Sequence, residues 1–236
     1  AGVMAAMFVA CAEQTITLAP QMCEKPGRML APGEIPTPAD VALDAYCAAK
    51  IIGGNAPDGA ITIFGSARTK PGTPDYEFTR EFAFQWTKQY GEKFPILTGG
   101  GPGMMAAGNQ GAKEAGGKSL YLTSYFKGTA EENKNEFVTD GYVCASFAQR
   151  EADLVDYGAA IVIASGGVGT AWEIFESLSK IQTHKKNPCP VIFLGSEMKW
   201  QPFVLYMKHL ADIGTISPED LNLYKFAATP EEAVKL

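Results

Sequence analysis

Positive charge is scarce in this sequence of 236 residues, in which 20 Lys and Arg stand against 26 Asp and Glu and leave a formal net charge of −6. An acidic chain has no overall positive field to attract a polyphosphate backbone, so nucleic acid is not expected as a partner. Only two histidines occur, which excludes a multi-histidine metal site, and no metal is expected. No apolar run reaches the roughly 18 residues that cross a bilayer, so no membrane partner is expected.

Cysteines are also few: the sequence has five, and no two of them are spaced as in zinc ribbons or thioredoxin motifs. A reduced compartment is the simpler interpretation, and we expect a cytoplasmic protein. The apolar residues 3–12 resemble the core of a signal peptide, but no basic region precedes them. A signal remnant and a docking N-terminal helix both stay open for this segment.

The chain divides into two parts at residue 60. Residues 1–59 are poor in strand patterns, contain prolines at positions 20, 26, 32, 36 and 38, and hold one helical candidate at 39–51. We interpret them as an N-terminal extension. From residue 60 to 236, short apolar runs alternate with longer amphipathic stretches, which predicts one domain of alternating strands and helices.

The alternation of this second part favours an α/β fold. We expect a Rossmann-like doubly wound parallel sheet with helices on both faces and ligand at the carboxyl ends of the strands. The apolar runs predict buried strands at 60–64, 95–97, 119–122, 159–164 and 190–194. Helical spacing predicts helices at 76–90, 103–115 and 168–182.

A glycine-rich loop, residues 98–105 (TGGGPGMM), lies at one predicted strand-to-helix junction. Glycine allows the backbone to approach an anion, and the helix N-terminus supplies unpaired N–H groups. Gly101, Gly103 and Ala106 also fit a relaxed dinucleotide pattern, but the next strand ends in Thr123 and Ser124, without the acid that holds a ribose. A phosphate cradle, an NAD site and a tight structural turn all stay open for this loop.

A second loop, residues 165–173 (SGGVGTAWE), follows the predicted strand 159–164. Two such loops on neighbouring strand ends would form a two-part anion pocket. Thr170 offers a hydroxyl to a phosphate, and Glu173 lies about one turn into the helix, where it can face the same crevice. The alternative for Glu173 is a favourable interaction with the positive end of the helix dipole.

Other catalytic patterns are absent. Residues 116–119 (GGKS) resemble the end of a P-loop, but they lack its first glycine and precede a strand, so we interpret them as a turn. No G-x-S-x-G motif occurs, and no cysteine has a recognisable histidine partner, which leaves covalent nucleophilic catalysis without support.

Together, the two loops resemble the signature of the Lonely Guy (LOG) family, whose members are often mislabelled lysine decarboxylases. The family pattern P-G-G-x-G-T-x-x-E matches residues 166–173, with Ser165 in place of the leading proline. A family segment M-H-x-R-K is matched at Arg150 only, and Glu151 replaces its lysine. The likeness covers about residues 60–213 and leaves the first 59 residues unmatched.

The resemblance implies a cytokinin riboside 5′-monophosphate phosphoribohydrolase, or a related nucleosidase, that cleaves the N-glycosidic bond of a nucleoside 5′-monophosphate. Glu173 and Arg150 would be the catalytic side chains, and no cofactor is implied. Gln182 matches a family glutamine late in the signature helix. The substrate-binding positions implied are Gly65, Ser66, Gly99, Gly100, Gly101, Gly103, Met104, Glu132, Gly166, Gly167, Val168, Gly169 and Thr170.

Alternatives to this hydrolase remain. The same fold could belong to a non-catalytic carrier of a nucleotide or pterin-type cofactor, or to an NAD-linked oxidoreductase. Family members form dimers or larger assemblies, so a homo-oligomer is expected. The base preference would depend on walls supplied by the N-terminal extension, by residues 126–137 or by a neighbouring subunit.

Overall fold

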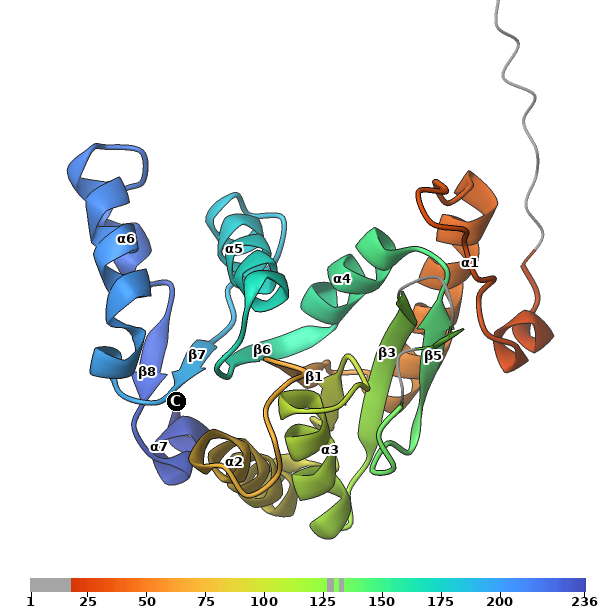
Figure 1. Ribbon diagram of the computed structural model, residues 1–236, viewed down its shortest axis with the longest axis horizontal. Helices are drawn as coiled ribbons and strands as arrows, with labels where there is room; N and C mark the ends of the chain where they lie inside the picture. Colours follow the sequence, from red (N-terminus) through yellow and green to blue (C-terminus); the bar gives the residue numbers. More distant parts are fainter. Residues whose placement is uncertain (1–17, 127–129, 132–133) are drawn as a thin grey trace, which may run out of the picture.

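The structure, a computed structural model, describes residues 18–126, 130–131 and 134–236. Within these residues, eight strands form one sheet in the order β4-β3-β2-β1-β6-β7-β8, and β5 pairs with β3 (Figure 1). The β3–β4 pair is antiparallel and the other described pairs are parallel. The expected parallel α/β sheet is confirmed.

Five of the strands coincide closely with predicted ones. They are β1 (Ala60–Phe64), β2 (Ile96–Thr98), β3 (Ser119–Phe126), β6 (Gly158–Ile163) and β7 (Val191–Leu194). Three further strands were not predicted: β4 (Ala130–Glu131), β5 (Asp140–Cys144) and β8 (Lys225–Ala227).

Helices cover both faces of the sheet, as a doubly wound fold requires (Figure 1). One face packs against α1 (Pro38–Ala48), α4 (Phe147–Asp156), α5 (Val168–Gln182) and α6 (Gln201–Asp212). The other packs against α2 (Pro74–Tyr90), α3 (Met104–Glu114) and α7 (Pro230–Lys235). Side chains alternate along β1, so that Ile61 and Ile63 join the core under α2 and α3, whereas Phe64 joins the core under α5.

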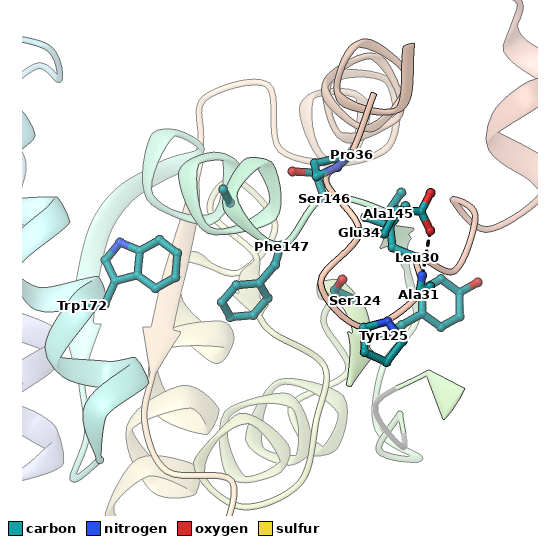
Figure 2. Close-up of a pocket in the computed structure, with 12 residues that line it drawn as sticks. Leu30, Ala31, Glu34, Pro36, Ser124, Tyr125, Ala145, Ser146, Phe147 and Trp172 are labelled. Carbon is teal, nitrogen blue, oxygen red and sulfur yellow. Dashed lines mark hydrogen bonds between the residues drawn. The ribbon is translucent and has the colours of Figure 1, made fainter. Parts of the chain in front are cut away.

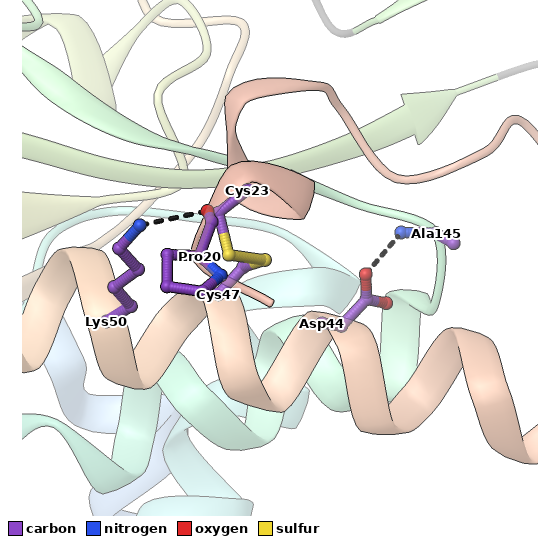
Figure 3. Close-up of a disulfide and its surroundings, with 6 residues drawn as sticks. All are labelled: Pro20, Cys23, Asp44, Cys47, Lys50 and Ala145. Atoms are coloured by element: carbon purple, nitrogen blue, oxygen red, sulfur yellow. Dashed lines mark hydrogen bonds between the residues drawn. A yellow bond between two sulfur atoms is a disulfide. The ribbon is translucent and has the colours of Figure 1, made fainter. Parts of the chain in front are cut away.

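The N-terminal segment lies against α1. A short 3₁₀-helix, η1 (Pro20–Glu24), leads into irregular chain, and α1 begins at a capping box in which Thr37 and Asp40 satisfy each other's backbone N–H groups. The Lys50 ammonium donates to the Pro20 carbonyl at 2.9 Å (Figure 3). Cys47, Ala48 and Ile52 share the core of the sheet. The division of the chain at residue 60 stays a prediction.

The expectation that the cysteines stay reduced is wrong for one pair. Cys23 of η1 and Cys47 of α1 form a disulfide, with a Cα–Cα distance of 5.3 Å (Figure 3). Their separation of 24 residues gave no indication of this pairing, because proximity here depends on how η1 folds back onto α1. Since disulfides are typical of oxidising compartments, the cysteine argument for a reduced compartment fails. Residues 3–12, with the signal-like pattern, lie outside the described residues.

Membrane insertion was tested on the described part of the chain. None of its helices is both long and apolar enough to cross a bilayer.

Candidate active site

The site lies where the strand order reverses. From β1 the sheet continues through β2 and β3 on one side and through β6, β7 and β8 on the other. The loops that follow β1 and β6 therefore diverge from adjacent strand ends, and the Ser66 N–H donates to the Ser165 carbonyl across this point at 2.9 Å. Doubly wound sheets bind their ligands in this kind of crevice.

A cleft of about 740 Å³ opens at this point, and we call it the switch-point cleft. Its volume is within the usual range for small-molecule sites. The structure brings both predicted catalytic residues and most of the predicted binding residues into its wall. They are Gly65, Ser66, Gly99, Arg150, Gly166, Gly167, Val168, Gly169, Thr170 and Glu173.

Four predicted binding residues of the first glycine loop lie beneath the cleft instead of lining it: Gly100, Gly101, Gly103 and Met104. Gly103 has a φ of +69°, and a Cβ there would lie 2.1 Å from the Ser66 carbonyl oxygen, so only glycine fits. The Met104 N–H donates to the same carbonyl at 2.9 Å. This loop therefore supports the residues that follow β1. Glu132 lies outside the described residues.

The second glycine loop gives the cleft a wall that is suited to an anion. Gly166 to Gly169 are exposed, and α5 begins at Val168. The first N–H groups of a helix have no partner within it and lie at the positive end of its dipole, so they suit a phosphate. A Cβ at Gly166 would lie 2.1 Å from the Thr170 hydroxyl oxygen, which explains the need for glycine at this position.

Glu173 lies one turn further along α5, on the same face as Thr170, and its side chain hydrogen-bonds the Thr170 hydroxyl. Burial at the floor of the cleft raises the pKa of Glu173 to about 8, and the neighbouring Glu151 carboxyl raises it as well. The Arg150 guanidinium and the Thr170 hydroxyl act in the opposite direction. Glu173 therefore exchanges a proton near neutral pH, which is the range that general acid–base catalysis requires.

Arg150 and Glu151 enter the cleft from α4, and both are almost completely buried. The Arg150 Nε donates to the Leu122 carbonyl at 3.0 Å, and its Nη1 contacts the Glu151 Oε1. Gly99 leaves room for this guanidinium, because a Cβ there would lie 2.0 Å from Nη2. The site thus holds two carboxyl groups and one guanidinium, of which Arg150 and Glu151 are buried and Glu173 is partly buried.

Contacts from α1 fix the first turn of α4. The Asp44 carboxylate accepts from the Ala145 N–H at 3.1 Å and from the Ser146 N–H at 2.7 Å, and Ser146 caps α4 by accepting from Gln149 (Figure 3 shows the Ala145 bond). Burial raises the pKa of Asp44 to about 6, against the effect of its two N–H donors. A residue of the N-terminal segment therefore positions the helix that carries Arg150.

Some cleft residues were missed by sequence reasoning. Arg68, exposed and two positions beyond Ser66, lines the cleft, and its backbone N–H donates to the Ser66 hydroxyl at 3.0 Å. Phe126 and Phe147 add aromatic wall, with ring centroids 5.5 Å apart. Arg68 could have been identified from the sequence, because it is a basic residue only two positions after the predicted binding residue Ser66. Gln182 is not among the cleft residues and donates to Asp220 at 2.7 Å.

The chain resembles known proteins in sequence and in fold. The model of a family described as "Possible lysine decarboxylase" matches residues 105–236. The cytokinin riboside 5′-monophosphate phosphoribohydrolase of Rhodococcoides fascians is 30% identical over 129 residues, which are 53% of this chain and 64% of that protein. The chain thus matches a little under two thirds of the length of this curated relative.

Solved structures share the fold. The molybdenum cofactor carrier protein of Chlamydomonas reinhardtii aligns with a TM-score of 0.53 and 22% identity, covering 75% of this chain and 94% of that one. The molybdenum cofactor binding protein of Rippkaea orientalis aligns with a TM-score of 0.51 and 22% identity, covering 75% and 91%. At this identity the likeness shows the fold alone.

Proposed function

The chain belongs to the family described as possible lysine decarboxylases, the Lonely Guy family that its motifs indicated, and from that premise we propose that it hydrolyses nucleoside 5′-monophosphates. The products would be the free base and ribose 5-phosphate. The substrate class comprises AMP-like nucleotides and cytokinin riboside monophosphates. One observation carries the proposal: the Glu173 carboxyl group, with Arg150 in the same cleft, lies one turn from a helix start suited to a phosphate.

The chemistry follows from the charge that develops as the bond breaks. Cleavage of the bond between C1′ and the base nitrogen leaves positive charge on the ribose ring, which a carboxylate stabilises. Water then supplies its hydroxyl group to C1′ and its other proton to Glu173, and that proton passes on to the departing base nitrogen, so that base and sugar are both neutral at these atoms and the Glu173 carboxylate is restored. Glu173 in its ionised form performs both the stabilisation and the proton removal.

Arg150 acts as an electrostatic and hydrogen-bonding group. A guanidinium does not give up a proton in this pH range, because its pKa lies above about 12. Its Nη1 contact with Glu151 and its Nε bond to Leu122 hold it in one orientation in the cleft. From there it can donate to the negative charge that develops on the leaving base.

The phosphate contributes binding energy at a distance from the reacting bond. Seating it on the α5 N-terminus fixes the sugar relative to Glu173, which lowers the entropic cost of reaching the transition state. Arg68 at the rim adds a positive charge to the same cleft. The phosphorylated substrate should therefore be far better than the nucleoside.

Lysine decarboxylation is not proposed. A pyridoxal enzyme needs a lysine to form the Schiff base, and among the described residues that line the cleft there is no lysine. Among the lining residues that the structure describes, the cations are two arginines, Arg68 and Arg150.

The direct test is a substrate screen. Purified protein is incubated with AMP, GMP, IMP, CMP, UMP and isopentenyl-adenosine monophosphate, and free base and ribose 5-phosphate are measured by chromatography. We expect release from at least one of them and loss of about 100-fold or more in kcat for Glu173→Gln. Glu176→Gln, on the same helix outside the cleft, is the control. Tight binding without release would favour the carrier alternative.

A further inference from the structure

A second cleft opens beside the switch-point cleft, on the far side of Phe147 (Figure 2). It has a volume of about 580 Å³, and Phe147 lines both spaces. The Trp172 ring packs edge-on against Phe147, with centroids 5.5 Å apart. The opposite wall comes from residues 27–36, which we call the strap and which belong to the N-terminal segment outside the matched family region.

The strap is held in place at its beginning. The Gly27 N–H donates to the Val143 carbonyl at 2.7 Å, and the Gly27 carbonyl accepts from the Tyr125 hydroxyl at 2.9 Å. A Cβ at Gly27 would lie 2.6 Å from the Ala145 nitrogen, so the strap reaches its position only with glycine here. Just before it, the Cys23–Cys47 disulfide ties the chain to α1.

Its remaining residues are fixed by an ion-pair cluster. Arg28 bonds to Asp40 at 2.8 Å through Nε and to Glu34 at 2.6 Å through Nη1. The other Glu34 oxygen accepts from the Ala31 N–H at 2.8 Å (Figure 2). These contacts preorganise the turn that faces Phe147, so little ordering is needed when a ligand enters.

The cleft is suited to an apolar group. Leu30, Ala31, Pro32 and Pro36 of the strap face it, together with the rings of Phe147 and Trp172. Its polar side chains already have partners in the protein: Ser124 donates to the Cys144 carbonyl, Tyr125 donates to Gly27, Ser146 accepts from Gln149, and Glu34 accepts from Arg28. A ligand group that needs hydrogen bonds gains little here, whereas an aromatic or aliphatic group buries apolar surface.

We propose that the strap determines base selectivity, by forming with Phe147 and Trp172 a subsite for an apolar substituent on the base of the nucleotide. This rests on the proposed function, which places the scissile bond beside Glu173. The base then lies against the shared Phe147 ring, and a substituent on its outer edge extends into the cleft under the strap. The selectivity element therefore lies outside the region that binds phosphate and ribose.

The test fills the cleft from the strap side. Ala31→Trp adds a bulky ring to a lining residue, whereas Ile35→Trp adds one to a strap residue that is 82% exposed and does not line the cleft. Affinities for AMP and N6-benzyl-AMP are measured by calorimetry in the Glu173→Gln background, where turnover does not interfere. Values of kcat/KM are measured in the otherwise unchanged protein.

We expect Ala31→Trp to weaken N6-benzyl-AMP about tenfold or more while AMP changes less than about twofold, and Ile35→Trp to change neither. Cys23→Ser, which removes the covalent bond between α1 and the chain just before the strap, should also reduce the preference for the benzyl compound. Equal losses for both nucleotides, or no loss for either, would overturn the role of the strap. Selective binding without base release by the unchanged protein would instead overturn the proposed hydrolysis and leave the subsite standing.

Discussion

The Glu151 carboxyl group lies in the same cleft as Glu173 and raises its pKa, and the Arg150 guanidinium contacts Glu151. Two carboxylates and one guanidinium would leave an unbalanced negative charge among buried side chains at this cleft, which is costly. One carboxyl group therefore keeps a proton. Burial and the neighbouring Glu151 carboxyl raise the pKa of Glu173, so Glu173 is the group that keeps the proton to higher pH, and Glu151 acts on the reaction through its effect on Glu173.

The first prediction concerns the pH dependence of activity. The pKa of Glu173 is raised to about 8, and its ionised form is the active one, so kcat/KM should rise with pH and level off above about 8. Glu151→Gln removes the neighbouring negative charge and lowers the pKa of Glu173. The rise in kcat/KM should therefore occur at a pH lower by about one unit or more.

The control for that shift is Asp153→Asn, on the same helix but away from the switch-point cleft. Asp153 is also a buried carboxyl group, and burial raises its pKa to about 6. Its replacement should leave the pH at which kcat/KM rises unchanged. If Glu151→Gln reduces the activity but does not shift the pH dependence of kcat/KM, Glu151 has only a structural role.

A second prediction concerns stability. Since the folded pKa of Glu173 lies above the ordinary glutamate value, the folded state holds this proton more tightly than the unfolded state does. The contribution of Glu173 to stability therefore falls as pH rises from about 4.5 to about 8. Glu173→Gln should have an unchanged Tm near pH 4.5 and a higher Tm than the unchanged protein at pH 8.5, by differential scanning calorimetry. A lower Tm at pH 8.5 would contradict the assignment.

The third prediction is dependence on the 5′-phosphate. Kinetic assays should give a kcat/KM for the monophosphate about 100-fold or more above that for the nucleoside, because the α5 N-terminus and Arg68 bind the phosphate. Arg68→Ala should lower the value for the monophosphate about tenfold and leave the nucleoside unaffected. Lys70→Ala, exposed and outside the cleft lining, is the matched control. Equal kcat/KM values for nucleoside and monophosphate would show that the phosphate does not bind at the α5 N-terminus.

The fourth prediction concerns the disulfide between Cys23 and Cys47. Closing a loop over a separation of 24 residues restricts the unfolded chain, so its loss should reduce the free energy of unfolding by about 3 kcal/mol. Urea unfolding of Cys23→Ser, compared with the oxidised protein, measures this change. If reductant lowers the stability of the unchanged protein but not that of Cys23→Ser, the bond is responsible. Equal stability of both proteins in oxidising buffer would show that this bond does not form.

Sequence reasoning located the sheet around the site because β1, β6 and β7 are uninterrupted apolar runs. It also located α5, whose bounds were predicted without error. It missed α4, a short helix of 10 residues whose buried face carries three charged residues, Arg150, Glu151 and Asp153. Charged residues on a buried face cannot be recognised from periodicity, since their burial depends on partners from other elements.

The strap and the disulfide were beyond prediction for a different reason. Residues 25–37 form no helix or strand, and where such chain lies is decided by single contacts. Gly27 against Val143 and Cys23 against Cys47 join positions far apart in sequence. Likewise, the family motif located Arg150, whereas the effect of Glu151 on Glu173 needed their placement in one cleft.

The reversal of strand order has a consequence for how the protein is made. Ser66 and Ser165 meet only after β6 has inserted beside β1, and β6 is synthesised after α2, α3 and α4. A nascent chain still lacking α5 already carries Arg150 and Glu151 but has neither Glu173 nor the helix start that would seat a phosphate. Ribosome-bound intermediates of this length should be inert toward nucleotides, so activity emerges only as the second half of the sheet closes.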